Sequence, residues 1–236
     1  MKVAILAGGR GTRLQDDTIA RPKAMAEIGG RPILWHVMDI YARAGFTDFV
    51  VALGYMAETV RKGMPRFCAD SGWNVELVDT GEQTQSAGRV LRLQPYLGNG
   101  TFCLTWCDGL ADIDIKALIA FHRGHGKLAT VTAVHPPARF GSLELDGGQV
   151  TRFAEKRIDR SAWINGAFFV LEPHVLAYID SDSTAWEGEP MERLVRDGEL
   201  MAYRHEGFWQ CMDTAADHHL LNEIWHGGAV PWKLQG

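Results

Sequence analysis

The sequence predicts an α/β fold in which a mixed, mainly parallel central sheet is covered by helices on both faces. Short apolar runs alternate with segments of helical periodicity over about residues 1–127. Repeated strand, helix, strand units produce parallel strands through right-handed crossovers. After about residue 128 the pattern changes to short strand-like runs joined by glycine-containing turns, which predicts a mixed extension of the same sheet.

The first half of the chain supplies most of the expected helices. The apolar run at 2–6 ends in glycines and is typical of a buried parallel strand. From Pro32, apolar residues follow the i, i+3, i+4, i+7 pattern of a helix that Gly45 ends. By the same criteria, further strands are expected at 49–53, 74–78 and 101–106, and further helices at 56–67, 86–97 and 113–126.

The second half is expected to be richer in strands, at 129–134, 142–145, 149–153 and 165–171. No low-complexity stretch or Pro/Gly/Ser-rich linker separates it from the first half. We therefore expect one domain over residues 1–236, with both halves facing a single cleft. Ligands of such sheets bind beyond the carboxyl ends of the strands.

Composition limits the classes of partner. The formal net charge of the 236 residues is −5, so the protein has no general attraction for nucleic acid or anionic lipid. The N-terminal apolar run is too short for a secretory signal, and no stretch approaches the roughly 18 apolar residues of a membrane span. We expect a cytoplasmic protein that binds neither nucleic acid nor membrane, with any anion held by local groups.

The loop that follows the first strand is the strongest candidate site. Three glycines and two arginines lie within Gly8–Arg13, but Leu14 breaks the dinucleotide pattern and the P-loop Lys-Ser/Thr is missing. Consecutive glycine amides can form an anion-binding nest, and arginines add charge-assisted contacts to phosphate oxygens. Lys23 lies ten residues from Arg13 and can face the same phosphate chain. A tight surface turn with basic residues is the alternative.

A resemblance adds to this interpretation. The stretches LAGGRGTRL, RPKAMAEIGGRPILWH, TWCDGLAD, FAEKR, WINGAFFVL and GFWQCMDT occur in the order found in sugar-1-phosphate nucleotidyltransferases. Within that superfamily, the chain most resembles glucose-1-phosphate cytidylyltransferases, and the similarity runs almost end to end. It implies a three-layer α/β/α, Rossmann-like nucleotidyltransferase fold. It also implies a nucleotide-binding half at about 1–127 and a sugar-phosphate-binding half at about 128–236.

The reaction that the resemblance implies needs no protein nucleophile. An oxygen of a sugar 1-phosphate attacks the α-phosphorus of a nucleoside triphosphate, and pyrophosphate leaves. Catalysis then rests on aligning two anions and on stabilising negative charge. The resemblance gives the catalytic roles to Arg13, on the departing pyrophosphate, and to Lys23, at the α-phosphate and the incoming sugar phosphate. The triphosphate would also be held by Leu6, Ala7, Gly8, Gly9, Arg10, Gly11 and Thr12.

Two aspartates match the family's Mg²⁺ ligands. Asp108 follows an expected strand in TWCDG, and Asp213 lies in QCMDT. Mg²⁺ accepts one or two carboxylates and completes its coordination with phosphate oxygens and water. From the residues alone, a turn after the strand is the favoured role for Asp108 and an N-cap the favoured role for Asp213, since Asp favours both places; the resemblance reverses that preference.

The resemblance assigns the remaining contacts by motif. Thr84, Gly88 and Arg89 would contact the nucleotide base beside a helix start, which also offers free amides. A solvated loop with a capping serine is the alternative for Thr84. The sugar phosphate would be bound by Gly141, Glu155, Lys156, Asn165 and Gly166.

The function expected from the sequence is therefore Mg²⁺-dependent transfer of a nucleotidyl group, with CTP as the favoured nucleotide and glucose 1-phosphate as the favoured acceptor. Another nucleotide (dTTP, UTP or GTP), another sugar 1-phosphate, and a catalytically silent nucleotide-sugar-binding homologue are the alternatives. A homo-oligomer is expected. The chain departs from the family pattern in three places: a longer insertion before LVDTG is missing, Arg10 replaces a leucine, and Arg157 replaces a proline.

Overall fold

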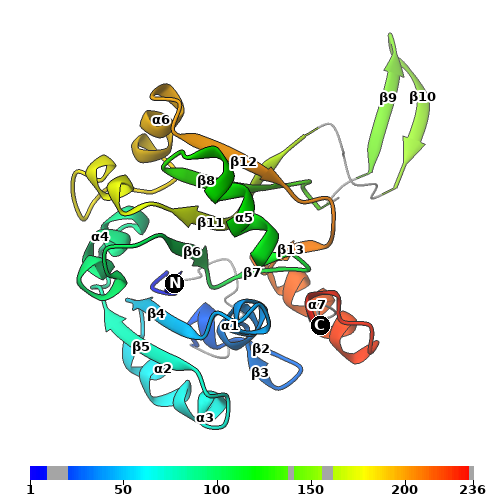
Figure 1. The fold of residues 1–236 in the computed structure, drawn as a ribbon. Coiled ribbons are helices and arrows are strands. Elements are labelled where there is room, and N and C mark those ends of the chain that lie inside the picture. The colour runs from blue at the N-terminus through cyan, green and yellow to red at the C-terminus, as the bar shows by residue number, and fades with distance from the viewer. Residues whose placement is uncertain (10–20, 138–140, 156–161, 234–236) are drawn as a thin grey trace.

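The computed structural model describes residues 1–9, 21–137, 141–155 and 162–233. A seven-stranded sheet runs through the molecule in the order β12-β8-β11-β6-β1-β4-β5 (Figure 1). Its strands are β1 (Val3–Leu6), β4 (Asp48–Leu53), β5 (Asn74–Asp79), β6 (Phe102–Trp106), β8 (Ala129–Val134), β11 (Ile164–Leu171) and β12 (Leu200–Arg204). β11 is antiparallel to both of its neighbours, and the other pairs are parallel, so the predicted mixed, mainly parallel sheet is confirmed.

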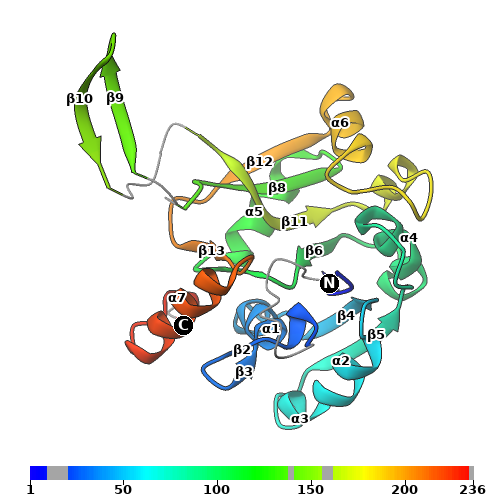
Figure 2. The same cartoon turned by 180° about the vertical axis from the view of Figure 1, so that it is seen from behind.

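The helices cover both faces of this sheet (Figures 1 and 2). They are α1 (Ile33–Arg43), α2 (Ala57–Gly63), α3 (Pro65–Cys68), α4 (Ser86–Leu97), α5 (Ile115–His125), α6 (Glu189–Arg196) and α7 (Ala215–His226). Shorter 3-10 turns are η2 (Lys23–Met25), η3 (Pro173–Tyr178) and η4 (Pro231–Lys233). Within the described ranges, no helix has the length and apolar character that a membrane crossing requires.

Alternating strand residues explain the three layers. Along β1, Val3 and Ile5 pack into the core with α1, α2 and α5, whereas Ala4 and Leu6 pack into the core with α4 and α6. Successive side chains of a strand point to opposite faces, so a strand buried on both sides must be apolar throughout. The apolar run at 2–6 is therefore continuous because β1 contributes side chains to two separate cores, one on each face of the sheet.

Several expected boundaries are close to the observed ones, and others are not. The helix expected at 86–97 is α4, while the helix expected at 56–67 is interrupted before Pro65 and becomes α2 and α3. Proline lacks the amide that continues a helix. The region between β11 and β12 contains η3 and α6, which the sequence pattern did not predict.

Among the described residues, three two-stranded sheets lie outside the central one. β2 (Glu27–Ile28) pairs with β3 (Arg31–Pro32), and β7 (Gly109–Ala111) pairs with β13 (Trp209–Cys211). β9 (Ser142–Asp146) and β10 (Gln149–Ala154) form a ribbon that projects from the body in both views (Figures 1 and 2).

The β9–β10 ribbon is amphipathic. Cross-strand pairs Leu143–Phe153 and Leu145–Val150 place four apolar side chains on one face, and each of them is at least half exposed. The other face carries an ion pair of 2.8 Å between Arg152 and Glu144. An isolated two-stranded hairpin is marginally stable in water, so an uncovered apolar face is unusual for such an element.

Candidate active site

The candidate site lies at the carboxyl-terminal edge of the central sheet. Gly8 and Gly9 follow β1, and Asp108 follows β6. These two strands are parallel neighbours, with Leu6 opposite Trp106 at their last paired position, so the segments that follow them start side by side. The fold thus brings the glycine loop and the aspartate of TWCDG to one edge.

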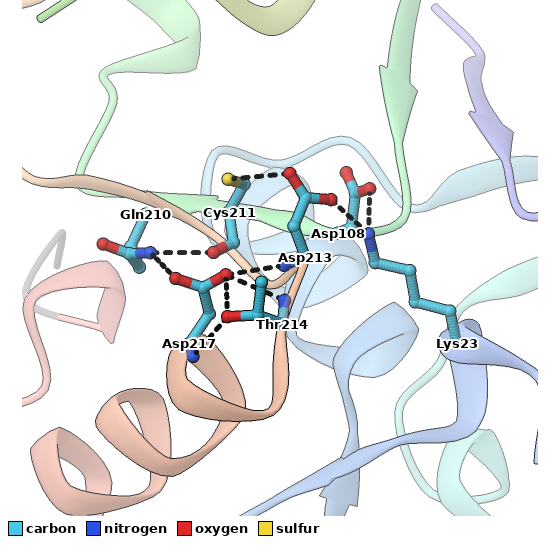
Figure 3. A network of polar contacts seen from close by, with 7 residues as sticks. All are labelled: Lys23, Asp108, Gln210, Cys211, Asp213, Thr214 and Asp217. Carbon is cyan, nitrogen blue, oxygen red and sulfur yellow. Dashed lines mark hydrogen bonds and ion pairs between the residues drawn. The ribbon is translucent and has the colours of Figure 1, made fainter. Parts of the chain in front are cut away.

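Lys23 connects two distant parts of the chain at this edge. Its Nζ donates to Asp108 Oδ2 at 2.8 Å and to Asp213 Oδ1 at 2.7 Å (Figure 3). The three side chains are 12%, 23% and 31% exposed, respectively, so the ion pairs are only partly screened by solvent. Burial by itself would lower the pKa of Lys23, but the two carboxylates outweigh it and hold the pKa above its ordinary value. Lys23 is therefore a permanent cation here.

Asp213 reaches Asp108 because β13 pairs with β7. Cys211 lies opposite Gly109 in this short antiparallel pair, and the amide of Met212 donates to Asp108 O at 2.9 Å. The backbone that carries one carboxylate is thus hydrogen-bonded to the backbone that carries the other. Asp213 does not cap the following helix, because Thr214 is the N-cap residue of α7.

The second oxygen of Asp213 faces a cysteine. Cys211 Sγ donates to Asp213 Oδ2 at 3.5 Å (Figure 3). Burial and the neighbouring carboxylates, first that of Asp213, raise the pKa of Cys211 to about 12. The thiol therefore keeps its proton near neutral pH and acts as a donor to the carboxylate.

A small cavity lies beside Lys23. Its volume is about 190 Å³, and it is lined by Leu6, Gly8, Gly9, Lys23, Ser86, Arg89, Trp106 and Cys107. Five of these eight residues were expected to act on the nucleotide or in catalysis. The structure therefore brings the described part of the glycine loop, Lys23 and Arg89 around one space.

Arg89 connects the chain segments around this cavity by hydrogen bonds. Its guanidinium is buried, and Nη1 donates to Leu53 O, Thr80 Oγ1 and Gly81 O at 2.8–2.9 Å. Nη2 donates to Gly8 O at 3.2 Å. A Cβ at Gly8 would lie 2.2 Å from this guanidinium, so the loop can approach Arg89 only because position 8 is glycine. The Arg89 guanidinium is committed to backbone carbonyls and the Thr80 hydroxyl, which makes it a support for the loop more than a free ligand for a base.

Thr84 and Gly88 are also committed within the protein. Thr84 Oγ1 donates to Thr80 O at 2.6 Å, and the Gly88 amide donates to Thr184 O at 3.4 Å. A Cβ at Gly88 would lie 2.5 Å from the backbone of Asp182. The expectation that this helix start offers free amides is thus wrong for Ala87 and Gly88, because both donate to Thr184 O.

The residues expected to bind the sugar phosphate form two groups. Gly141 and Glu155 lie at the base of the β9–β10 ribbon, where a Cβ on Gly141 would be 3.0 Å from Glu155 Oε2. Asn165 and Gly166 lie in an irregular part of β11. Asn165 Oδ1 accepts from the Ala167 amide at 2.8 Å.

The β11 group adjoins β13, the strand that Asp213 follows. Gly166 O accepts from Trp209 Nε1, in β13, at 2.8 Å. Five expected residues, Arg10, Gly11, Thr12, Arg13 and Lys156, lie outside the described residues.

One site residue was missed by sequence reasoning. Asp217, in the first turn of α7, accepts hydrogen bonds from the segment that contains Asp213 (Figure 3). The pattern Thr214-Ala-Ala-Asp217 has capping-box spacing and could have identified the contact to Thr214. It could not have identified the link to Asp213.

Comparison with known proteins decides the family. The nucleotidyl transferase family model matches residues 2–218. The chain belongs to this family. Among nucleotidyl transferases, it is 45% identical to the glucose-1-phosphate cytidylyltransferase of Salmonella typhi, over 99% of both chains. That alignment spans 254 positions, more than the 236 residues present here, so the Salmonella protein has residues without a counterpart in this chain.

Other nucleotidyl transferases have lower sequence identity to this chain. The mannose-1-phosphate guanyltransferase beta-A of Xenopus laevis is 31% identical over 92% of this chain, which spans 62% of the Xenopus protein. Among solved structures, HddC from Yersinia pseudotuberculosis superposes with a TM-score of 0.75 at 22% identity, over 95% of this chain and 99% of HddC. The inositol-1-phosphate CTP transferase from T. maritima superposes with a TM-score of 0.72 at 19% sequence identity, over 97% of each chain. These structures support the fold alone.

Proposed function

We propose that the protein transfers a cytidylyl group from CTP to α-D-glucose 1-phosphate, giving CDP-glucose and pyrophosphate. The observation that carries the proposal is the 45% identity to a glucose-1-phosphate cytidylyltransferase over 99% of both chains. The site geometry agrees, because a partly buried cation and two carboxylates converge beside the glycine loop. The proposed location of the protein is the cytoplasm, because that is where its proposed nucleoside triphosphate substrate is found.

The reaction is an in-line displacement at the α-phosphorus of CTP. A phosphate oxygen of glucose 1-phosphate forms the new P–O bond, and the bond to the bridging oxygen of pyrophosphate breaks with its electron pair. Both reactants are polyanions, so their approach needs fixed positive charge. Lys23 supplies it from a rigid turn, where Pro22 precedes it in extended backbone. In this proposal, Arg13 neutralises the departing pyrophosphate.

The two aspartates suit a magnesium ion. Asp108 and Asp213 already converge on one cation, the ammonium of Lys23, so their oxygens are placed for a shared positive charge. Carboxylates are the ligands that Mg²⁺ prefers. When bound with the nucleotide, Mg²⁺ would supply charge stabilisation at the α-phosphate. In the proposed division of the chain, residues 1–127 hold the nucleotide and residues 128–236 the sugar phosphate, with Asp213 contributed across that division.

Release of pyrophosphate tests the proposal. Purified protein is assayed with CTP, UTP, dTTP, ATP and GTP, each combined with glucose 1-phosphate, mannose 1-phosphate and other hexose 1-phosphates. We expect the highest kcat/KM for CTP with glucose 1-phosphate. Release with dTTP, UTP or GTP but not CTP would replace the cytidylyl assignment. No release from any pair would favour a silent nucleotide-sugar-binding protein.

A second part of the proposal concerns assembly. The exposed apolar face of the β9–β10 ribbon supports a homo-oligomer in which this face is covered by another copy. Light scattering after size exclusion tests it with Leu145→Ser and Phe153→Ser together, against Glu144→Gln on the opposite face. We expect only the apolar double variant to shift toward monomer. A wild-type monomer would remove the oligomer from the proposal.

A further inference from the structure

The carboxylate of Asp217 is engaged on both oxygens. Oδ2 accepts from the Asp213 amide at 3.0 Å, from the Thr214 amide at 2.8 Å and from Thr214 Oγ1 at 2.9 Å. Oδ1 accepts from Gln210 Nε2 at 3.1 Å. Figure 3 shows Asp217 between the end of β13 and the turn that carries Asp213.

This arrangement exceeds what capping a helix requires. A capping box needs only two bonds, from the Asp217 amide to Thr214 Oγ1 and from the Thr214 amide to Asp217, and both are present. The bonds to Asp213 and Gln210 lie outside the box. They connect the first turn of α7 to a buried strand residue and to the backbone of a candidate metal ligand.

The position of Asp213 depends on these contacts. Its backbone is held by Asp217, and its side chain extends from there to Lys23 and Cys211. Gln210 Nε2 also donates to Cys211 O at 2.8 Å, so the strand end is tied to the same carboxylate. A ligand fixed in this way loses less freedom when it binds a cation.

We propose that Asp217 is a positioning residue for Asp213, setting the distance between the Asp213 and Asp108 carboxylates for a divalent cation bound with the nucleotide. This inference rests on the proposed function. Asp217 acts through the backbone of residues 213–214 and has no contact with substrate in this role. Gln210 orients Asp217 from the opposite oxygen.

Metal affinity without turnover tests the role. Mn²⁺ binding is followed by electron paramagnetic resonance in protein saturated with CTP and free of sugar phosphate, so no reaction occurs. Asp217→Asn should weaken Mn²⁺ binding roughly tenfold, the size expected when a group that orients a metal ligand is lost. Added metal should restore much of the lost kcat, since the substrate contacts are unchanged.

A matched control separates positioning from capping. Asp114 caps α5 by accepting from the Ala117 amide at 2.9 Å, and it has no described contact with Asp108, Asp213 or Lys23. Asp114→Ala removes this cap, so it should lower the melting temperature and leave the Mn²⁺ affinity at the wild-type value. If Asp217→Asn behaves in the same way, Asp217 is only a capping residue.

Two further measurements keep the outcome decisive. If Asp217→Asn does not fold, Gln210→Met removes one bond to Asp217 and should weaken Mn²⁺ binding in the same direction; unchanged affinity there would overturn the inference. Wild-type protein that binds no Mn²⁺ with CTP would instead contradict the proposed function, so the two failures are distinguishable.

Discussion

The ammonium nitrogen of Lys23 lies 2.7 Å from Oδ1 of Asp213, although 190 positions separate the two residues in the chain. The same nitrogen contacts Asp108 at 2.8 Å, so one cation satisfies both carboxylates. A divalent ion that binds these oxygens must compete with Lys23 for them. The lysine thus serves as the counter-ion of the site in the ligand-free protein.

Replacing Lys23 should change the metal affinity of the protein even when no nucleotide is bound and no reaction occurs. Lys23→Met leaves two carboxylates facing each other, so we expect Mn²⁺ affinity of the nucleotide-free protein to rise roughly tenfold. Turnover should fall at least roughly 100-fold because the fixed charge at the phosphates is lost. Electron paramagnetic resonance and pyrophosphate release measure the two effects. Lys127→Met, which breaks a peripheral ion pair with Glu199, is the control. Unchanged Mn²⁺ affinity in Lys23→Met would mean that the ammonium does not compete.

Replacing either aspartate of the proposed metal site should lower turnover without disturbing the fold. Asp108→Asn and Asp213→Asn each keep the side-chain shape, and Lys23 retains one carboxylate partner in either variant. We expect pyrophosphate release to fall roughly 100-fold or more in each, with the circular dichroism spectrum unchanged. Near-normal turnover in one variant would remove that residue from the proposed metal site.

Arg89 should matter for stability as well as for activity. Arg89→Met removes the Arg89 donor from the Gly81 carbonyl and one of the donors to the Leu53 carbonyl, and we expect a loss of about 3 kcal/mol in the free energy of unfolding. Urea denaturation measures it. The control Arg92→Met breaks an exposed ion pair with Asp182 and should cost clearly less. Equal losses would argue against the buried network.

A buried histidine should make stability depend on pH. Burial lowers the pKa of His36 from 6.5 to about 4, and its Nε2–H donates to Ile28 O at 2.9 Å. Nδ1 accepts from Trp232 Nε1, so a proton there would place two donors face to face. The unfolded chain therefore takes up the proton first as the pH falls. The stabilising contribution is complete above pH 6.5, is lost between about 6.5 and 4, and amounts to about 3 kcal/mol.

The His36→Gln variant isolates this effect. Urea denaturation at several pH values should show a steeper loss of stability below pH 6.5 in the wild type than in the variant, with no further divergence below about pH 4. His219→Gln, at an exposed position of α7, should follow the wild-type curve. Parallel curves for wild type and His36→Gln would contradict the prediction.

How far the sequence predicts the structure depends on whether a feature is local. The helix at 86–97 follows from its own periodicity and was predicted with its observed bounds. The pairing of β13 with β7 was not predictable, because each strand has three residues and their register depends on contacts across 100 positions of chain. Pro65, by contrast, was visible and should have divided the helix expected at 56–67.

The same distinction applies to the site. Spacing alone left Asp108 as a turn residue and Asp213 as a cap, and only the resemblance assigned them to a metal. Their convergence on Lys23 is a property of the sheet topology. The sequence around Asp217 predicts a helix cap, and this local pattern gives no indication of the hydrogen bond from the Asp213 amide. The commitment of Arg89 to the backbone carbonyls of Gly8, Leu53 and Gly81, which lie in three separate segments of the chain, has no sequence signal at all.

The late position of β13 in the chain has a consequence for biosynthesis. The glycine loop, Lys23 and Asp108 are synthesised within the first half of the protein, but Asp213 follows the last strand. A nascent chain that has folded its parallel sheet therefore carries Lys23 with a single carboxylate partner. The second partner arrives only when β13 emerges and pairs with β7. An incomplete polypeptide that ends before residue 209 could thus be compact and yet lack half of the proposed cation site.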